Sequence, residues 1–275
     1  MNSKLHLYTS YGILLIYTLF TIIPILWVFS TSLKPGEEAM HFPPSLIPSS
    51  FTLENYKFVF TDPYLVRGLI NSFIVSISGM VLCVAISALA GYSFARYRFS
   101  GKNIIISVML GMFMIPVVMN VIPLYIMLGK LGLLNTYTGL ILTYQILIIP
   151  LNVFLLKNYF ETIPRELEDA AMVDGCSRIG AFLRVTLPLA WPGLAVASIF
   201  SFRFAWNEFI FAYTFTSKPE MHVFQVALFK FMGLYRINWG YLTACIMIGM
   251  LPVLIMLIFF QEQMAKGLTM GAIKG

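Results

Sequence analysis

The sequence predicts an all-α polytopic membrane protein, and its composition, hydropathy and charge distribution each support this class. Of its 275 residues, 59% are hydrophobic and 11% are charged, whereas an ordinary soluble domain is about half apolar and about a quarter charged. The mean hydropathy is +0.84. This composition excludes a soluble enzyme, a nucleic-acid-binding protein and a disordered linker. The net charge of +6 includes no long basic cluster, so we assign it to membrane orientation rather than to a polyanionic partner.

Six stretches of the chain are apolar enough and long enough to cross a bilayer, which takes about 20 residues of helix. They lie at about residues 11–33, 69–95, 104–128, 136–156, 189–214 and 240–261. The first stretch is too long for the apolar region of a cleavable signal peptide, and no small-residue cleavage site follows it. We therefore expect a single domain over residues 1–275, with six transmembrane helices and one long connection at residues 157–186.

The distribution of lysine and arginine predicts which side of the membrane each connection faces. With six spans, both termini lie on the same side. That side, with the second and fourth connections, carries ten basic residues, and the other side carries seven. The short second connection is decisive because Arg96, Arg98 and Lys102 lie beside helix ends with no acid among them. Both termini are predicted to be cytoplasmic.

The second predicted span carries small residues at four-residue spacing, namely Ser87, Gly91 and Ala95, with Ala88 beside them. In lipid, small residues allow helices to approach closely, so this stripe predicts a helix-packing face, with the lining of a passage as the alternative. The three cysteines have no metal-ligand spacing. No metal site is therefore expected.

The connection at residues 157–186 does not have the composition of a simple loop. Pro164 suits the start of a helix, and three acids follow it near the positive end of the helix dipole, namely Glu166, Glu168 and Asp169. Helical spacing then gives a narrow face of small side chains at Leu167, Ala170, Ala171 and Asp174. Gly175 supplies a helix stop, and a second short helix runs until Leu187 and Pro188 start the fifth span. Such a hairpin either enters a groove of another protein or merely joins two spans.

Arg203 and Glu208 are the only charged residues inside any predicted span. Each costs roughly 2.5–3.5 kcal/mol near the centre of a membrane helix, so such residues normally face a cavity or a partner. Arg203 and Asn207 lie about 40° apart around a helix, whereas Glu208 lies about 140° from Arg203, too far for an ion pair on one face. Each charge therefore needs a partner of its own from another helix, a lipid headgroup or water.

A helix face with a guanidinium group, an amide and aromatic rings suits a polyhydroxylated ligand. The candidates for lining a substrate passage are Arg203, Trp206, Asn207 and Glu208. Weaker candidates are Gln145, Asn152 and Asn120, because a lone amide in a span more often bonds a neighbouring helix. The alternative for the two charges is that they only hold helices together.

The hairpin sequence resembles the EAA loop of ABC-importer permeases. The matching residues are Asp169-Ala170-Ala171, then Gly175, then Val185, Leu187 and Pro188, with Asp169 in place of the usual glutamate. The resemblance continues in FTLENYKFVF at residues 51–60, the pair Asn71-Ser72, LGLLNTYTGLI at 131–141, FAWNEF at 204–209 and the tail KGLTMGAIKG. These segments resemble the sugar-transporting, maltose-type branch with six spans.

The resemblance implies the type I ABC importer permease fold, in which the hairpin is the coupling helix that docks in a cytoplasmic ATPase subunit. It assigns coupling roles to Glu166, Asp169, Ala170, Ala171, Asp174, Gly175, Leu187 and Pro188. It also implies that the tail contacts the ATPase through Lys266, Gly267 and Lys274, with a frayed terminus as the alternative. The chain itself has no phosphate-binding loop of the G-x-x-x-x-G-K-[ST] type. ATP and Mg²⁺ are therefore expected on a partner subunit, and no cofactor and no enzymatic activity on this chain.

The implied assembly contains a distinct second permease, two ATPase subunits and an extracytoplasmic solute-binding protein, in the cytoplasmic membrane of a prokaryote. The binding protein is expected to contact residues 34–67 and 218–236. The expected substrate is an oligosaccharide, moved by alternating access. The alternatives are a small anionic solute, such as a sugar acid or glycerol phosphate, with Arg203 as counter-charge, and an ion-coupled secondary transporter. An intramembrane enzyme is disfavoured because His6, His41 and His222 lie outside the spans and apart.

Overall fold

The computed structural model describes residues 2–36, 38–234 and 238–269, and all regular secondary structure in these ranges is helical. The chain divides into two compact units. The first contains residues 1–66 and 227–252, and the second contains residues 67–226 and 253–275. The helix α3 (Pro63–Arg96) begins in the first unit and runs into the second.

The first unit contains α1 (Asn2–Ser32), η1 (Glu38–Met40) and α2 (Glu54–Thr61), with most of α12 (Phe224–Leu234) and the first part of α13 (Trp239–Thr269). Buried Asn55 of α2 donates hydrogen bonds to the carbonyls of Ser32 and Lys34, both at 2.8 Å. In the loop that follows α1, the Ser49 hydroxyl and amide bond the Glu38 carboxylate and hold its pKa below the usual range. The polar residues after α1 thus form an ordered segment.

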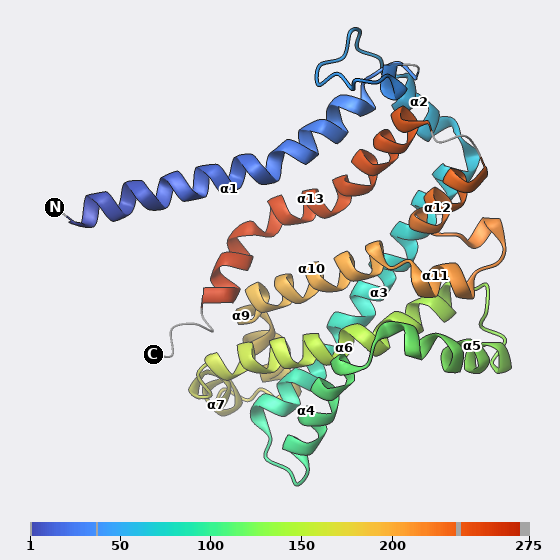
Figure 1. Ribbon diagram of the computed structural model, residues 1–275. Helices are drawn as coiled ribbons and strands as arrows, with labels where there is room; N and C mark the ends of the chain where they lie inside the picture. Colours follow the sequence, from blue (N-terminus) through green and yellow to red (C-terminus); the bar gives the residue numbers. More distant parts are fainter. Residues whose placement is uncertain (1, 37, 235–237, 270–275) are drawn as a thin grey trace. The chain divides into compact units, whose positions relative to one another are not determined.

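The second unit is built around α3, α6 (Tyr137–Thr162) and α10 (Trp191–Asn207). In Figure 1, α6 and α10 lie side by side, and α3 crosses them. A Cβ atom at Gly193 of α10 would come within 2.6 Å of the Tyr159 ring of α6. A Cβ atom at Gly91 of α3 would lie 3.0 Å from the backbone nitrogen of Lys157 in α6. Ser87 and Ala95, on either side of Gly91, are buried. The predicted packing face of small residues is therefore confirmed.

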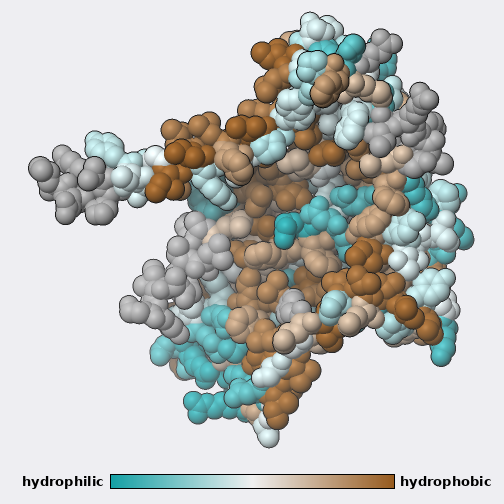
Figure 2. Space-filling model, in the orientation of Figure 1, coloured by the Kyte–Doolittle hydropathy of each residue, from teal (hydrophilic) through white to brown (hydrophobic). Residues whose placement is uncertain are grey.

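Within the residues that the structure describes, four helices are long and apolar enough to cross a membrane, and they coincide with the first, second, fourth and sixth predicted spans. They are Leu7–Ser32, Pro63–Arg96, Tyr137–Thr162 and Trp239–Met264. Large hydrophobic side chains are exposed over much of the visible surface (Figure 2), as on a protein that is solvated by lipid. The number of membrane crossings, six, and the division into one domain stay predictions.

The third predicted span, residues 104–128, is not one helix. The structure has α4 (Lys102–Gly111), η2 (Met112–Met114), η3 (Val117–Asn120) and α5 (Val121–Lys130) in its place. The break lies at Ile115 and Pro116, where Ile115 is extended (φ −81°, ψ 118°). Proline has no N–H to donate and disfavours a helical conformation in the residue before it. A continuous apolar sequence thus folds into two short helices.

The fifth predicted span is also interrupted. The helical run Arg178–Leu189 meets α10 at a bend of 76° around Ala190. Leu187 and Pro188 lie in α9 (Leu187–Leu189), before this bend, and where the fifth span begins stays a prediction. Trp191 begins α10, because Pro192 in its first turn needs no hydrogen-bond acceptor. A second break follows Asn207, and α11 (Ile210–Phe215) completes the region.

Candidate functional site

Residues 157–162 of the predicted connection belong to the end of α6, so the hairpin is defined as residues 163–189. It opens with α7 (Glu166–Val173), which carries three acids in its first turn. The helix ends as predicted at Gly175, whose φ is +92°. The amide of Gly175 donates to the carbonyl of Met172, and the amide of Cys176 donates to the carbonyl of Ala171, at 3.1 and 3.0 Å. This pair of bonds is the Schellman end of a helix, which requires a left-handed residue and so favours glycine.

The second half of the hairpin returns toward the core. Ser177 caps α8 (Arg178–Ala181) by accepting a hydrogen bond from the amide of Gly180 at 3.1 Å. A π-helical turn, η4 (Phe182–Thr186), follows and joins α9. Phe182 is buried, with its ring centroid 4.5 Å from that of Tyr92 in α3. The hairpin is therefore a folded element that packs on the end of α3.

Most of the predicted coupling residues are open to solvent in this chain. The exposed ones are Glu166, Asp169, Ala170, Asp174, Gly175 and Pro188, whereas Ala171 and Leu187 are half-buried. Val173 and Ile179, two apolar side chains of the same hairpin, are 86% and 72% exposed. Hydrophilic residues gather at this end of the second unit in Figure 2. The hairpin thus presents small, apolar and acidic groups on one accessible element.

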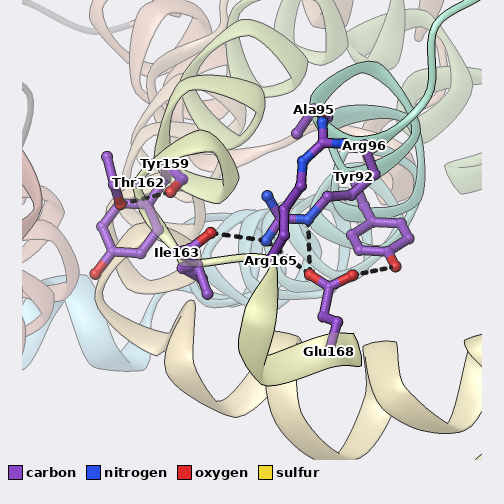
Figure 3. Close-up of polar contacts among 8 residues, drawn as sticks. All are labelled: Tyr92, Ala95, Arg96, Tyr159, Thr162, Ile163, Arg165 and Glu168. Atoms are coloured by element: carbon purple, nitrogen blue, oxygen red, sulfur yellow. Dashed lines mark hydrogen bonds and ion pairs between the residues drawn. The ribbon is translucent and has the colours of Figure 1, made fainter. Parts of the chain in front are cut away.

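Glu168 is the residue that sequence reasoning missed. Its Oε1 accepts a hydrogen bond from Arg96 Nε at 2.7 Å, and its Oε2 accepts one from the Tyr92 hydroxyl at 2.8 Å. Both donors lie on the last turns of α3, and the three side chains point toward one another in Figure 3. The side chains of Arg96 and Glu168 are only 7% and 9% exposed. A buried ion pair therefore fixes α7 to α3.

Two further arginines complete the polar cluster around Glu168. Arg165 donates to the carbonyl of Ala95 at 3.1 Å, and the guanidinium of Arg178 lies 5.6 Å from the centroid of the Tyr97 ring. These groups line a pocket of about 150 Å³. Arg96 and Glu168 were both visible in the sequence beside the same predicted membrane boundary. A single sequence, however, gives no way to choose among three neighbouring acids.

Two of the three weaker passage candidates, Gln145 and Asn152, are bonded to neighbouring helices. Gln145 of α6 is buried, and its Nε2 donates to Ile141 O and Gly79 O at 2.8 and 3.3 Å. Asn152 is fully buried, and its Nδ2 donates to Ser201 Oγ of α10 at 2.6 Å. Asn120 is the last residue of η3 and is half-buried. The bonds of Gln145 and Asn152 agree with the expectation that lone amides in spans bond adjacent helices.

The structure brings together Arg203 and Asn207 but separates them from the other candidates of the fifth span. Both are exposed, and Asn207 Nδ2 donates to the carbonyl of Arg203 at 2.9 Å. Trp206 is 1% exposed and stacks on Phe202, with ring centroids 5.6 Å apart. It therefore packs inside this chain, away from the face that Arg203 and Asn207 share.

Glu208 acts as a cap on α11. Its two carboxylate oxygens accept hydrogen bonds from the amides of Phe211 and Ala212, at 2.8 and 3.0 Å. These amides belong to the first turn of α11, where backbone donors have no partner within the helix. The expectation that Glu208 needs a partner from another helix is met by the backbone donors of α11, which the break after Asn207 makes a separate helix.

At the other end of α3, neutral side chains hold the segment that links α11 to α12. Asn71 is fully buried and donates to the carbonyls of Glu220 and His222, both at 2.8 Å, while it accepts from the Tyr137 hydroxyl at 2.7 Å. Ser72 Oγ accepts from the amide of Phe224 at 2.8 Å. The resemblance had singled out the pair Asn71-Ser72, but the sequence did not show its role.

The tail lies at the limit of the described chain. Lys266 and Gly267 belong to the last turns of α13, and Lys274 lies outside the described residues. In the part of the chain that the structure describes, no group of three or more His, Cys, Asp or Glu residues is placed to hold a metal ion.

A core of broken apolar helices with a folded hairpin at one end defines the class of protein, a polytopic helical membrane protein. Residues 84–269 match the family described as the binding-protein-dependent transport system inner membrane component, and the chain belongs to this family. The chain is 38% identical over 264 residues to the sulfoquinovosyl glycerol transport system permease protein SmoH of Agrobacterium fabrum, covering 96% of this chain and 92% of that protein.

Other relatives are similar over nearly their whole length. The trehalose transport system permease protein SugB of Mycobacterium tuberculosis is 36% identical, with 93% of each chain covered. The diacetylchitobiose uptake system permease protein NgcG of Streptomyces coelicolor is 34% identical, with 96% of this chain and 88% of that protein covered.

A chain of a bacterial ABC transporter involved in the import of alginate superposes with a TM-score of 0.80 at 23% identity. The match covers 95% of this chain and 97% of that one. This likeness shows the fold, which is that of type I ABC importer permeases.

Proposed function

We propose that this chain is one permease subunit of an ATP-driven importer of a carbohydrate. The observation that carries the proposal is the hairpin, which ends α7 at Gly175 and leaves Asp169 and Ala170 accessible. Small residues place little between the backbone and a partner, so such an element fits deep in a groove of another protein. A folded and anchored hairpin can transmit a displacement, whereas a flexible connection cannot.

The substrate class is supported by the substrates of the relatives. Trehalose, diacetylchitobiose, sulfoquinovosyl glycerol and alginate appear in their descriptions, and all contain sugar units. A carbohydrate needs hydrogen-bond donors and acceptors together with flat apolar surfaces. On this chain, the exposed side chains of Arg203 and Asn207 in α10 can supply hydrogen-bond donors and acceptors. We propose that these two residues line the passage.

The partners follow from what one chain of this size lacks. Six helices hardly enclose an oligosaccharide, so a second permease completes the passage, and ATP and Mg²⁺ are bound by two ATPase subunits. An alginate transporter, which this chain resembles in fold at a TM-score of 0.60, was crystallised with a pentasaccharide-bound periplasmic protein. We propose such a binding protein for this chain, with both termini, the hairpin and the tail residues Lys266, Gly267 and Lys274 on the cytoplasmic side.

The test is a bulky substitution in the hairpin, Gly175→Trp, in the complete complex reconstituted in vesicles. Tryptophan strains the left-handed position and covers the small face, so we expect ATP-dependent uptake to fall at least about tenfold, the scale of losing one well-packed contact. Gly101→Trp is the matched control, because Gly101 also has a positive φ, at +83°, and a Cβ there also meets nothing within 4 Å. Uptake by the control should stay near the wild-type value.

Unaltered uptake with Gly175→Trp would show that the hairpin does not dock on the ATPase. Uptake that collapses with the ion gradient and continues without ATPase subunits would instead identify a secondary transporter. The substrate class has a separate measurement, since the cognate binding protein should bind neutral or acidic sugars. A receptor that binds peptides or metal ions and ignores carbohydrates would end the carbohydrate assignment.

A further inference from the structure

Glu168 differs from the other acids of α7 because it is the one buried residue of this eight-residue helix. Glu166 and Asp169 are exposed. Burial of a carboxylate is unfavourable unless the group is paired and hydrogen-bonded. A helix with a single buried side chain has little apolar contact of its own to hold it. The position of α7 relative to α3 therefore depends on the polar contacts of Glu168.

These contacts use both carboxylate oxygens and both lead to the same helix. Oε1 is bound to Arg96 and Oε2 to Tyr92, which lie one turn apart at the end of α3. Charge-assisted hydrogen bonds of this kind are directional. They fix the rotation and the sliding of α7 against α3, as well as the distance between the two helices.

The backbone near the start of α7 is fixed to the same turn of α3. Arg96 also donates to the carbonyl of Ile163 at 3.0 Å, and Arg165 donates back to the carbonyl of Ala95 at 3.1 Å. The end of α3 is therefore bound to residues 163, 165 and 168, before and within α7 (Figure 3). Two apolar surfaces can slide against each other and keep similar contacts. These hydrogen bonds, in contrast, can all form only when α7 and α3 have one relative position.

We propose that Glu168 is a positioning residue that transmits movement of α7 to α3 through Arg96 and Tyr92. This inference rests on the proposed function, because it takes the hairpin to be the element that the ATPase moves. α3 continues from this contact as one helix of 34 residues and packs against α6 at Gly91. Without the pair, α7 keeps its exposed docking surface but shifts against α3, and ATP is hydrolysed with less solute moved.

The experiment measures solute moved per ATP hydrolysed by the complete complex in vesicles. Glu168→Gln leaves Arg96 buried without a counter-charge, and we expect the ratio to fall about fivefold, within the range for residues that carry coupling between sites. The matched control is Glu161→Gln, which breaks the 3.0 Å ion pair with Lys157 inside α6. That pair joins no two helices, so the control should keep the wild-type ratio.

A second variant separates transmission from stability. Replacing a buried ion pair by apolar residues of similar size often leaves stability unchanged. The double variant Arg96→Met with Glu168→Met removes both charges together and leaves only two neutral groups unpaired, the Tyr92 hydroxyl and the Ile163 carbonyl. It should therefore assemble and melt closer to the wild-type temperature than Glu168→Gln, yet keep a ratio about fivefold low. A purely structural role predicts that the ratio recovers together with the melting temperature.

The inference is overturned by a wild-type ratio in an assembled Glu168→Gln complex, or by recovery of the ratio in the double variant. If Glu168→Gln does not assemble, Tyr92→Phe decides, because it removes one hydroxyl and keeps the ring against Phe182. A lowered ratio supports the inference and a wild-type ratio overturns it. Uptake by the unmodified complex without ATPase subunits would instead contradict the proposed function itself.

Discussion

The two ends of α3 are fixed within the second unit by different chemistry. At one end, Arg96 pairs with the carboxylate of Glu168, a side chain bonded to a side chain of opposite charge. At the other end, the amide of Asn71 bonds the backbone carbonyls of Glu220 and His222. Both anchors are buried, so the difference lies in what each one holds and not in how well water is excluded.

Asn71 bonds backbone carbonyls, so it can hold the segment in place independently of the side chains that the segment carries. Residues 217–221 are therefore held in position while their own side chains stay available, and four of them, residues 217–220, are exposed. Arg96 instead bonds the side chain of Glu168, so this contact requires a carboxylate at position 168 that points toward α3. The first arrangement suits a fixed platform, and the second suits an element that must move together with α3.

The largest effect on stability is expected from removing the platform anchor with Asn71→Leu. The buried carbonyl of His222 and that of Glu220 then lose the amide donor, and unpaired buried groups cost about 1–3 kcal/mol each. We expect a total loss of about 3 kcal/mol, which lowers the melting midpoint of the purified protein by roughly 5–10 °C. Tyr137→Phe removes the bond to Asn71 Oδ1 and a long, exposed bond of 3.4 Å that the Tyr137 hydroxyl accepts from Arg67, and it should cost about 1 kcal/mol. Equal shifts for the two variants would contradict the assignment of the donors.

A smaller loss of stability is expected from substitutions of Asn135, which lies just before α6 and bonds the same segment, residues 217–221. Its Oδ1 accepts from the amides of Ser217 and Lys218, at 2.6 and 3.0 Å, and its φ is +58°. Asn135→Gly keeps the backbone conformation and removes the acceptor, so we expect a loss of about 1 kcal/mol, since water can reach this half-buried site. Asn135→Asp keeps an acceptor and should melt near the wild-type temperature. Identical melting curves for the glycine and aspartate variants would show that the side chain holds nothing.

The main helices were predictable because their signal is local. Charged residues delimit the apolar runs that became α1, α3, α6 and α13, and a helix end that needs a positive φ explains Gly175. Pro116 also gave a local signal for the break in the third predicted span, but the uncharged sequence around it concealed the break.

The contacts that define the candidate site are not local. Arg96 and Glu168 lie 72 residues apart in the chain, and nothing in one sequence distinguishes Glu168 from Glu166 or Asp169. Likewise, no proline or glycine marks the break after Asn207. That break depends on Glu208, which becomes a cap only when the chain turns and α11 begins.

The smallest effect on stability is expected for an ion pair near the end of α6 that leads into the hairpin. Unlike the pair of Arg96 and Glu168, this pair is not fully buried. Lys157 and Glu161 form an ion pair one turn apart on α6, with side chains 15% and 37% exposed. Exposed pairs of this spacing contribute about 0.3–0.5 kcal/mol and are screened by salt. We therefore expect Glu161→Gln to lower the melting midpoint by no more than about 2 °C at low ionic strength, and by nothing measurable in about 0.5 M salt, where the Debye length is short. The lowered ratio of solute moved per ATP in Glu168→Gln should persist at both salt concentrations, because salt screens the buried pair of Arg96 and Glu168 only weakly. If high salt instead made the transport ratio of Glu168→Gln equal to that of the wild type, the carboxylate of wild-type Glu168 would have to be accessible to water. The two ends of α3 would then not both have buried anchors.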